Sequence, residues 1–146
     1  MRGFRLAAVI LGVALAVGQA ASGEDYGFRV IVNASNPITS ISRGELSSIF
    51  LKQETSWPDG QVALPVDQGE SAQVRSDFSR VVLRRPVAAV KSYWNKQIFS
   101  GSGVPPVEKG SNEDVVAYVN AFHGAVGYVG LSAALSAGVK PVRLTD

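Results

Sequence analysis

Strand-like and helix-like segments alternate between residues 28 and 144, and this alternation constrains the fold more than any other feature. Short apolar runs rich in branched side chains occupy residues 28–32, 62–66, 125–129 and 139–144, as strands do. Segments with apolar residues at helical spacing stand between them. The pattern predicts one α/β domain whose sheet is mostly parallel or mixed and is flanked by helices on both faces.

Capping residues and glycines mark the expected helix boundaries. Ser42 and Glu45 have the spacing of a capping box, in which each side chain bonds the other residue's backbone amide. Ser71 is expected to cap a second helix, and Gly124 is expected to end the fourth helix as a glycine of positive φ. The remaining helices are expected over residues 86–100, 111–123 and 131–137.

The first 21 residues have the composition of a secretory signal peptide. Arg2 and Arg5 precede an apolar run over residues 6–17, and small residues follow it. The run is shorter than the ~20 residues that a membrane span needs. We therefore expect a periplasmic or secreted protein with no membrane insertion after signal removal. Its mature part, residues 22–146, would form one periplasmic domain with its core over residues 28–144.

Charge and composition narrow the function classes. The chain has 14 Lys and Arg against 12 Asp and Glu, but Arg2 and Arg5 lie in the expected signal peptide. The mature chain is then close to neutral, which argues against nucleic acid as a partner. Cysteine is absent, so no disulfide framework is expected.

No arrangement of residues typical of an enzyme is present. His123 is the only histidine, no Gly-x-Ser-x-Gly sequence occurs, and the acidic residues lack metal-ligand spacing. His123 is expected to interact with the end of the fourth helix rather than to catalyse a reaction. We therefore expect a non-enzymatic protein without a cofactor or a metal ion.

The segment after the strand at residues 62–66 is the candidate for an anion site. Free amides and the helix dipole at the start of the second helix attract anions. Asp67 and Glu70, however, place two negative charges there, which would cap the helix and repel an anion. Structural capping and anion binding both remain open. Four arginines of the second helix form either a solvated face or a site for phosphate or an acidic partner: Arg75, Arg80, Arg84 and Arg85.

An ordered series of short motifs resembles a known family. In chain order the motifs are Asn36-Pro37, Leu46 to Phe50, Trp57 to Gly60, Tyr93-Trp94, Ile98 to Gly101, Pro105-Pro106 and Gly124 to Tyr128. The series resembles the second lobe of the phosphate-binding proteins of ABC transporters, and especially their short single-lobe relatives. The resemblance implies a single lobe of the type II periplasmic-binding-protein fold that acts as an exported solute-binding module.

The resemblance implies phosphate or another small anion as ligand. Open α/β sheets bind ligands at the carboxyl ends of their strands, which selects the expected site residues Asn33, Ser35, Asp67, Gln68 and Ser71. Asn33 and Ser71 would donate hydrogen bonds, and Asp67 would accept one from a protonated oxygen. Asp67 stands near the position of a family arginine, and only Ser71 matches the family's Ser-Gly-Thr.

Two other functions are consistent with the same sequence. The lobe could dock on an envelope sensor, porin or transporter through apolar residues around Trp57 and the basic stretch Arg80–Arg85, and bind no small molecule. Alternatively, two copies could form a homodimer that rebuilds one binding cleft.

Overall fold

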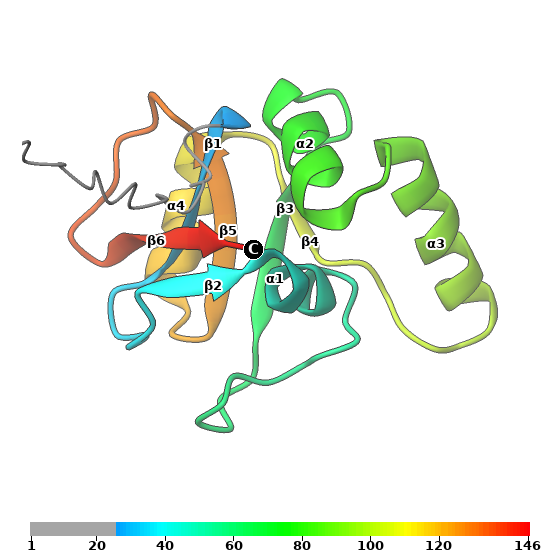
Figure 1. Ribbon diagram of the computed structural model, residues 1–146, viewed down its shortest axis with the longest axis horizontal. Helices are drawn as coiled ribbons and strands as arrows, with labels where there is room; N and C mark the ends of the chain where they lie inside the picture. The colour runs from blue at the N-terminus through cyan, green and yellow to red at the C-terminus, as the bar shows by residue number, and fades with distance from the viewer. Residues whose placement is uncertain (1–25) are drawn as a thin grey trace, which may run out of the picture.

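The computed structural model describes residues 26–146, in which six strands form one sheet with the order β2-β6-β1-β5-β3-β4 (Figure 1). The expected signal peptide over residues 1–21 lies outside the described residues. The strands are β1 (Phe28–Asn33), β2 (Ser40–Ser42), β3 (Leu64–Gln68), β4 (Val107–Lys109), β5 (Ala125–Gly130) and β6 (Val139–Thr145).

The sheet is mixed, which confirms the predicted fold class. β1 runs antiparallel to both of its neighbours, β5 and β6. The other three pairs, β2 with β6, β3 with β5 and β3 with β4, are parallel. The carboxyl end of β1 therefore lies at the opposite edge of the sheet from the carboxyl ends of β3 and β5.

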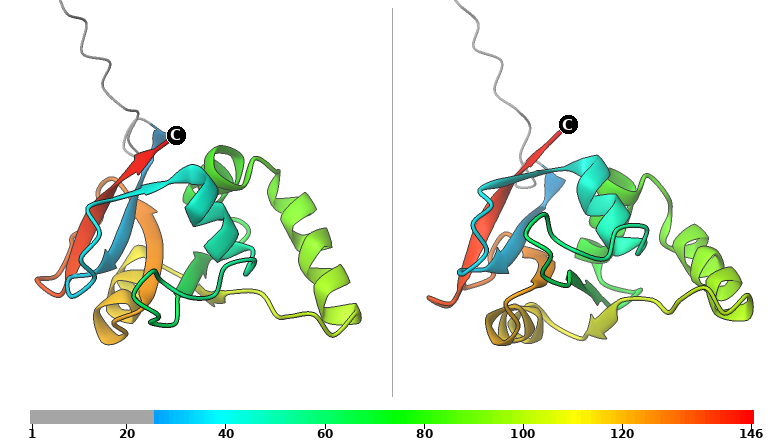
Figure 2. Two further views of the ribbon diagram at one scale, coloured as in Figure 1. Left: turned by 60° about the horizontal axis from the view of Figure 1, so that its bottom comes forward. Right: turned by 90° about the horizontal axis from the view of Figure 1, so that it is seen from below.

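Helices cover both faces of the sheet (Figure 2). They are α1 (Arg43–Phe50), α2 (Gln73–Phe78), the π-helical turn η2 (Ser79–Leu83), α3 (Val87–Phe99) and α4 (Asn112–Ala121). Alternate residues of β1 point to opposite faces. Phe28, Val30 and Val32 join the core under α1 and η2, whereas Ile31 packs with Val115 and Val119 of α4.

The expected capping box at α1 is present in full. The Ser42 hydroxyl accepts from the Glu45 amide, and the Glu45 carboxylate accepts from the Ser42 amide, both over 3.1 Å. Ser111 likewise caps α4. Ser71 does not cap α2, because the helix begins two residues later and its N-cap, Ala72, makes no side-chain bond.

Three other boundaries differ from expectation. The expected strand at 62–66 forms over Leu64–Gln68, because Val62 instead bridges Ser56. Residues 131–137 form a turn and an irregular segment rather than a helix. Gly124 is not an αL cap, since its φ is not positive. A Cβ there would lie 2.0 Å from the Val62 carbonyl oxygen. The glycine instead allows two backbone segments to approach closely.

Helix α3 projects from the rest of the domain (Figure 1). Only Val90 and Trp94 of its 13 residues are buried. Ile98 has the same helical spacing but is 51% exposed, and Phe99 at the end of the helix is 96% exposed. No helix within residues 26–146 is both long enough and apolar enough to cross a membrane.

Candidate functional site

A buried polar cluster lies where β3 ends. We call it the β3-end cluster; it comprises Asp67, Gln68, Arg75, Asn112 and Tyr128. Asp67, Gln68 and Arg75 are each no more than 5% exposed. Such burial of charged groups is tolerated when they are paired and hydrogen-bonded.

One carboxylate oxygen of Asp67 is the centre of the cluster. Its Oδ1 lies 3.1 Å from Arg75 Nη1 and accepts from the Gln68 amide over 3.1 Å. The Tyr128 hydroxyl donates to the same oxygen. Arg75 Nη1 also donates to the Gln68 carbonyl oxygen over 2.7 Å. No hydrogen bond from the described residues reaches the other carboxylate oxygen, Oδ2.

The electrostatics of the cluster reflect its burial. Burial raises the pKa of Asp67, and the Arg75 guanidinium acts against that rise. Burial also raises the pKa of Tyr128, as does the neighbouring Asp67 carboxylate. Tyr128 therefore stays protonated at neutral pH and remains a donor. The ring of Phe78 stacks on Tyr128 with centroids 3.9 Å apart, which fixes the position of the hydroxyl.

The position of Arg75 corrects one alternative from the sequence. Arg75 does not belong to a solvated basic face of α2, because its side chain points inward to Asp67. Its Nε is buried and has no hydrogen-bond partner among residues 26–146. The cation neutralises the buried carboxylate, so the pair adds no net charge to this edge of the sheet.

Gln68 and Asn112 connect the end of β3 to the start of α4. Gln68 Nε2 donates to Asn112 Oδ1 over 2.9 Å and to the Tyr128 carbonyl oxygen over 3.1 Å. Asn112 Oδ1 also accepts from the Gly130 amide over 3.1 Å. The ends of β3 and β5 and the start of α4 are thereby held together at one edge.

The turn over residues 69–72, which we call the β3–α2 turn, covers this edge. Its Glu70 and Ser71 are exposed, and their amides donate no hydrogen bond to any described residue. Glu70 lies 3.5 Å from Lys91 Nζ of α3. Asp67 and Glu70, the two acidic residues expected to repel an anion, therefore both have a cationic partner.

The structure does not bring all five expected site residues together. Asp67, Gln68 and Ser71 share one edge of the sheet, whereas Asn33 and Ser35 lie at the opposite edge. Asn33 Nδ2 donates to the carbonyl oxygens of Val119 and Asn120, at the end of α4. Since α4 has ten residues, about 15 Å of helix separates these groups.

The cause of this separation is the direction of β1. Asn33 ends a strand that is antiparallel to β5, so its carboxyl end cannot meet that of β3. Asn33 Oδ1 accepts from the amide and hydroxyl of Ser35, over 3.0 and 2.7 Å. Both residues hold the turn after β1 in place.

Sequence reasoning missed Arg75, Asn112 and Tyr128 as members of the cluster. The available signal was Asp67 itself, an acidic residue at the end of an apolar strand, which needs a buried cation or donor. Nothing in the helical pattern distinguished Arg75 from the other arginines of its segment.

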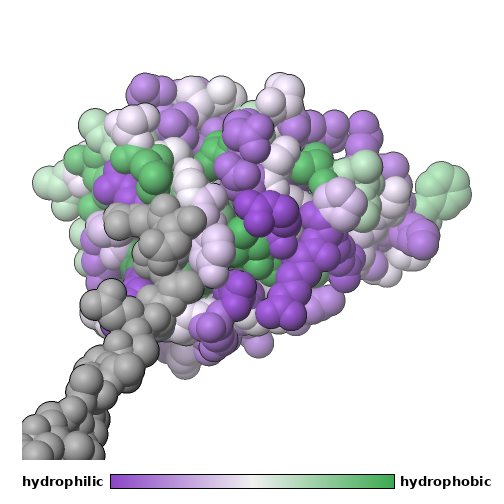
Figure 3. All heavy atoms as spheres, turned by 45° about the horizontal axis from the view of Figure 1, so that its top comes forward, coloured by the Kyte–Doolittle hydropathy of each residue, from purple (hydrophilic) through white to green (hydrophobic). Residues whose placement is uncertain are grey.

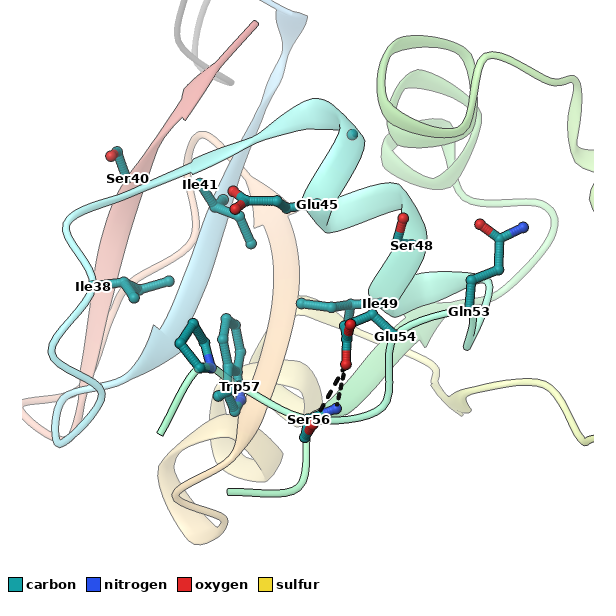
Figure 4. A pocket seen from close by; sticks show the side chains of 12 residues that line it. Ile38, Ser40, Ile41, Glu45, Ser48, Ile49, Gln53, Glu54, Ser56 and Trp57 are labelled. Atoms are coloured by element: carbon teal, nitrogen blue, oxygen red, sulfur yellow. Dashed lines mark hydrogen bonds between the residues drawn. The ribbon is translucent and has the colours of Figure 1, made fainter. Parts of the chain in front are cut away.

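A separate groove of about 740 Å³ lies between α1, the start of β2 and the loop over residues 53–58 (Figure 4). Ile38, Ile41 and Ile49 give it apolar walls, and Glu45 and Glu54 are its charged lining residues. Among residues 26–146, two carboxylates and no cationic side chain line the groove, so it does not suit an anion.

Trp57 lies beside this groove but is not an exposed contact. Its side chain is 5% exposed, and its Nε1 donates to the Gly124 carbonyl oxygen over 2.9 Å. Trp57 itself therefore does not contribute an exposed side chain to the docking surface expected around it.

Solved structures similar to this chain are phosphate-binding proteins. An ABC-type phosphate transport receptor from Vibrio cholerae matches with a TM-score of 0.63 and 23% identity, over 81% of this chain and 46% of its own. A phosphate ABC transporter substrate-binding protein from Clostridium perfringens, solved with bound phosphate, matches with a TM-score of 0.65 and 16% identity, over 81% and 44%. PstS from Borrelia burgdorferi matches with a TM-score of 0.62 and 15% identity, over 81% and 47%.

These matches define the class of fold. The chain has the α/β fold of a periplasmic-binding-protein lobe, as the motifs predicted. It spans less than half the length of each matched structure, as a short single-lobe relative would. No family model matches the sequence, and no curated protein matches it significantly.

Proposed function

We propose that this chain is an exported, non-enzymatic binding module that holds phosphate or another small anion weakly at the β3–α2 turn. The observation that carries the proposal is the fold shared with phosphate-binding proteins over 81% of the chain. Because a single lobe encloses only one side of a ligand, the affinity would be low.

The residues of the turn suit this role in three ways. The Ser71 hydroxyl and the free amides of Glu70 and Ser71 can donate to anion oxygens. Asp67 Oδ2 can accept a hydrogen bond from a protonated phosphate oxygen. Gln68 positions the turn through Asn112. Asn33 and Ser35 lie outside the proposed site, at the other edge of the sheet.

Thermal unfolding of residues 22–146 tests the proposal. At a phosphate concentration about tenfold above Kd, binding to the native state alone stabilises it by about 1.4 kcal/mol. This corresponds to a rise in Tm of about 5 °C for a domain of this size. We expect the rise with phosphate to exceed that with sulfate and to disappear in Ser71→Ala.

Ser136→Ala is the matched control, because Ser136 is exposed and precedes β6 at the other edge of the sheet. A Tm that responds equally to every anion, or a phosphate response unchanged by Ser71→Ala, would refute binding at this turn.

The second candidate function is docking on an envelope protein such as a sensor, porin or transporter. The exposed apolar residues at and after the end of α3 favour it: Phe99 and Ile98 are 96% and 51% exposed, and Val104 in the segment after the helix is 62% exposed. Single exposed apolar residues are common, but several so close in sequence, at and just after the end of a projecting helix, are typical of a contact surface.

Photo-crosslinking in cells from position 99 tests docking. We expect one discrete adduct from that position and none from position 136, together with an unchanged Tm for Phe99→Ser. An adduct of twice the chain mass would instead support the homodimer, and light scattering that shows a monomer at every concentration would exclude it. A smear without a discrete adduct would contradict docking through α3.

A further inference from the structure

A second hollow lies between η2 and the start of α3, and its volume is about 580 Å³. Arg80, Arg84 and Arg85 line it together with Asp77, Pro86 and Val87; we call it the basic hollow. Figure 3 looks onto the face of the molecule that carries α2, where strongly hydrophilic side chains gather. This hollow is separate from the β3-end cluster, whose arginine, Arg75, is turned into the core.

The charge of the basic hollow is positive. Asp77 is its one acidic lining residue, and Arg80 Nη2 lies 3.7 Å from its Oδ1. Arg84 and Arg85 form no ion pair with any residue between 26 and 146. Arg84 and Arg85 therefore have no compensating carboxylate, and both line a hollow that is partly shielded from solvent.

The backbone is shaped to bring the arginines together. The C-cap of the π-helical turn η2 is Arg84, which adopts a left-handed conformation with φ 53° and ψ 36°. The Arg85 amide donates to the Ser79 carbonyl oxygen over 3.3 Å, and the Ser79 hydroxyl donates to the Arg85 carbonyl oxygen over 2.6 Å. Left-handed non-glycine residues and π-helical turns are both found frequently at functional sites.

One arginine side chain is also held in place. The Arg85 guanidinium lies over the Tyr93 ring, 5.4 Å from its centroid. This cation–π contact uses the face of the guanidinium and leaves its N–H donors free. A guanidinium that is ordered before binding loses less entropy when a ligand binds.

The start of α3 adds to the positive field. Pro86, its N-cap, offers no side-chain cap, and the first turn contains no acidic residue. Pro86 and Val87 both line the basic hollow. The positive end of a 13-residue helix dipole therefore faces the same space as the three arginines.

We propose that the basic hollow binds the phosphate group of a phosphomonoester. Arginine forks match phosphate oxygens in charge and geometry. The hollow is far larger than a phosphate ion and leaves room for the organic group to which the phosphate is esterified. The phosphate group belongs either to a soluble phosphoester or to an anionic lipid headgroup. This site does not depend on the proposed function at the β3–α2 turn.

Calorimetric titration of residues 22–146 with glycerol 3-phosphate tests the soluble source. Flotation with phosphatidylcholine vesicles, with and without phosphatidic acid, tests the lipid source. In whichever of these two experiments shows binding, we expect Arg84→Asn to weaken it about tenfold or more. Asparagine tolerates the left-handed conformation, so this variant removes the guanidinium and keeps the fold.

Two control variants distinguish binding in the basic hollow from general charge attraction and from binding at the β3–α2 turn. Arg143→Gln removes the same charge from an exposed residue of β6 and should not change the affinity. Ser71→Ala removes any weak anion binding at the β3–α2 turn, and binding in the basic hollow should persist in this variant. The proposal is overturned if the protein binds neither glycerol 3-phosphate nor vesicles that contain phosphatidic acid. It is equally overturned if Arg143→Gln weakens binding as much as Arg84→Asn does. It is also overturned if Ser71→Ala abolishes binding while Arg84→Asn leaves it intact.

Discussion

Replacing Arg75 with methionine lowers the free energy of unfolding by about 3–5 kcal/mol at neutral pH, as expected when one partner of a buried ion pair is removed. The Asp67 carboxylate then stays buried with no cation, since Arg75 Nη1 is the group 3.1 Å from its Oδ1. Urea unfolding measures the loss. Arg80→Met is the matched control, because the Arg80 side chain is 66% exposed and should cost less than about 0.5 kcal/mol.

The pH dependence of Arg75→Met has a definite sign. Burial already raises the pKa of Asp67 above its ordinary value of 3.8, and Arg75 opposes that rise. Without Arg75 the pKa rises further. Between 3.8 and the raised pKa the native state binds a proton that the unfolded state does not, so stability falls as pH increases.

The difference in free energy of unfolding between the wild type and Arg75→Met should therefore become smaller in mild acid. The double variant Asp67→Asn, Arg75→Met removes both charges and should recover part of the loss at neutral pH. A deficit that is independent of pH and unaffected by Asp67→Asn would show that Arg75 acts through packing rather than through its charge.

Gly124→Ala is expected to destabilise the domain by about 3 kcal/mol, at the upper end of what an inserted methyl group costs in a packed region. The added Cβ would lie 2.0 Å from the Val62 carbonyl oxygen, so the backbone must move. That movement disturbs the two bonds that Gly124 accepts, from the Leu64 amide and from Trp57 Nε1.

A fall in Tm of about 10 °C measures this effect. Gly110→Ala is the control, since Gly110 is exposed and a Cβ there would meet nothing within 4 Å. Equal Tm values for the two variants would contradict the close approach of these segments.

Local signals in the sequence predicted the elements better than their arrangement. The capping box at Ser42 and Glu45 is fixed by neighbours in sequence and formed as predicted. The direction of β1 was not accessible, because β1 is buried on both faces of the sheet and reads as a near-continuous apolar run, which parallel strands also give. For this reason Asn33 was grouped with Asp67, which lies at the other edge.

The candidate site was predictable only in part. Asp67 and Gln68 were found because they follow a buried strand. Arg75 was missed because its burial depends on Asp67, which its side chain reaches only after α2 packs on the sheet. The segment 131–137 has apolar residues at helical spacing, Leu131, Ala134 and Leu135, but it forms a turn and an irregular segment. Local spacing alone does not stabilise so short a helix.

The central claim, that this lobe binds a small anion at the β3–α2 turn, is tested most directly by a phosphate titration of ¹⁵N-labelled residues 22–146 followed by amide chemical shifts. The account predicts saturable shifts concentrated at Gly69, Glu70 and Ser71, with little change at Asn33 and Ser35. Absence of saturable shifts at these three amides, with phosphate in large excess, would contradict it.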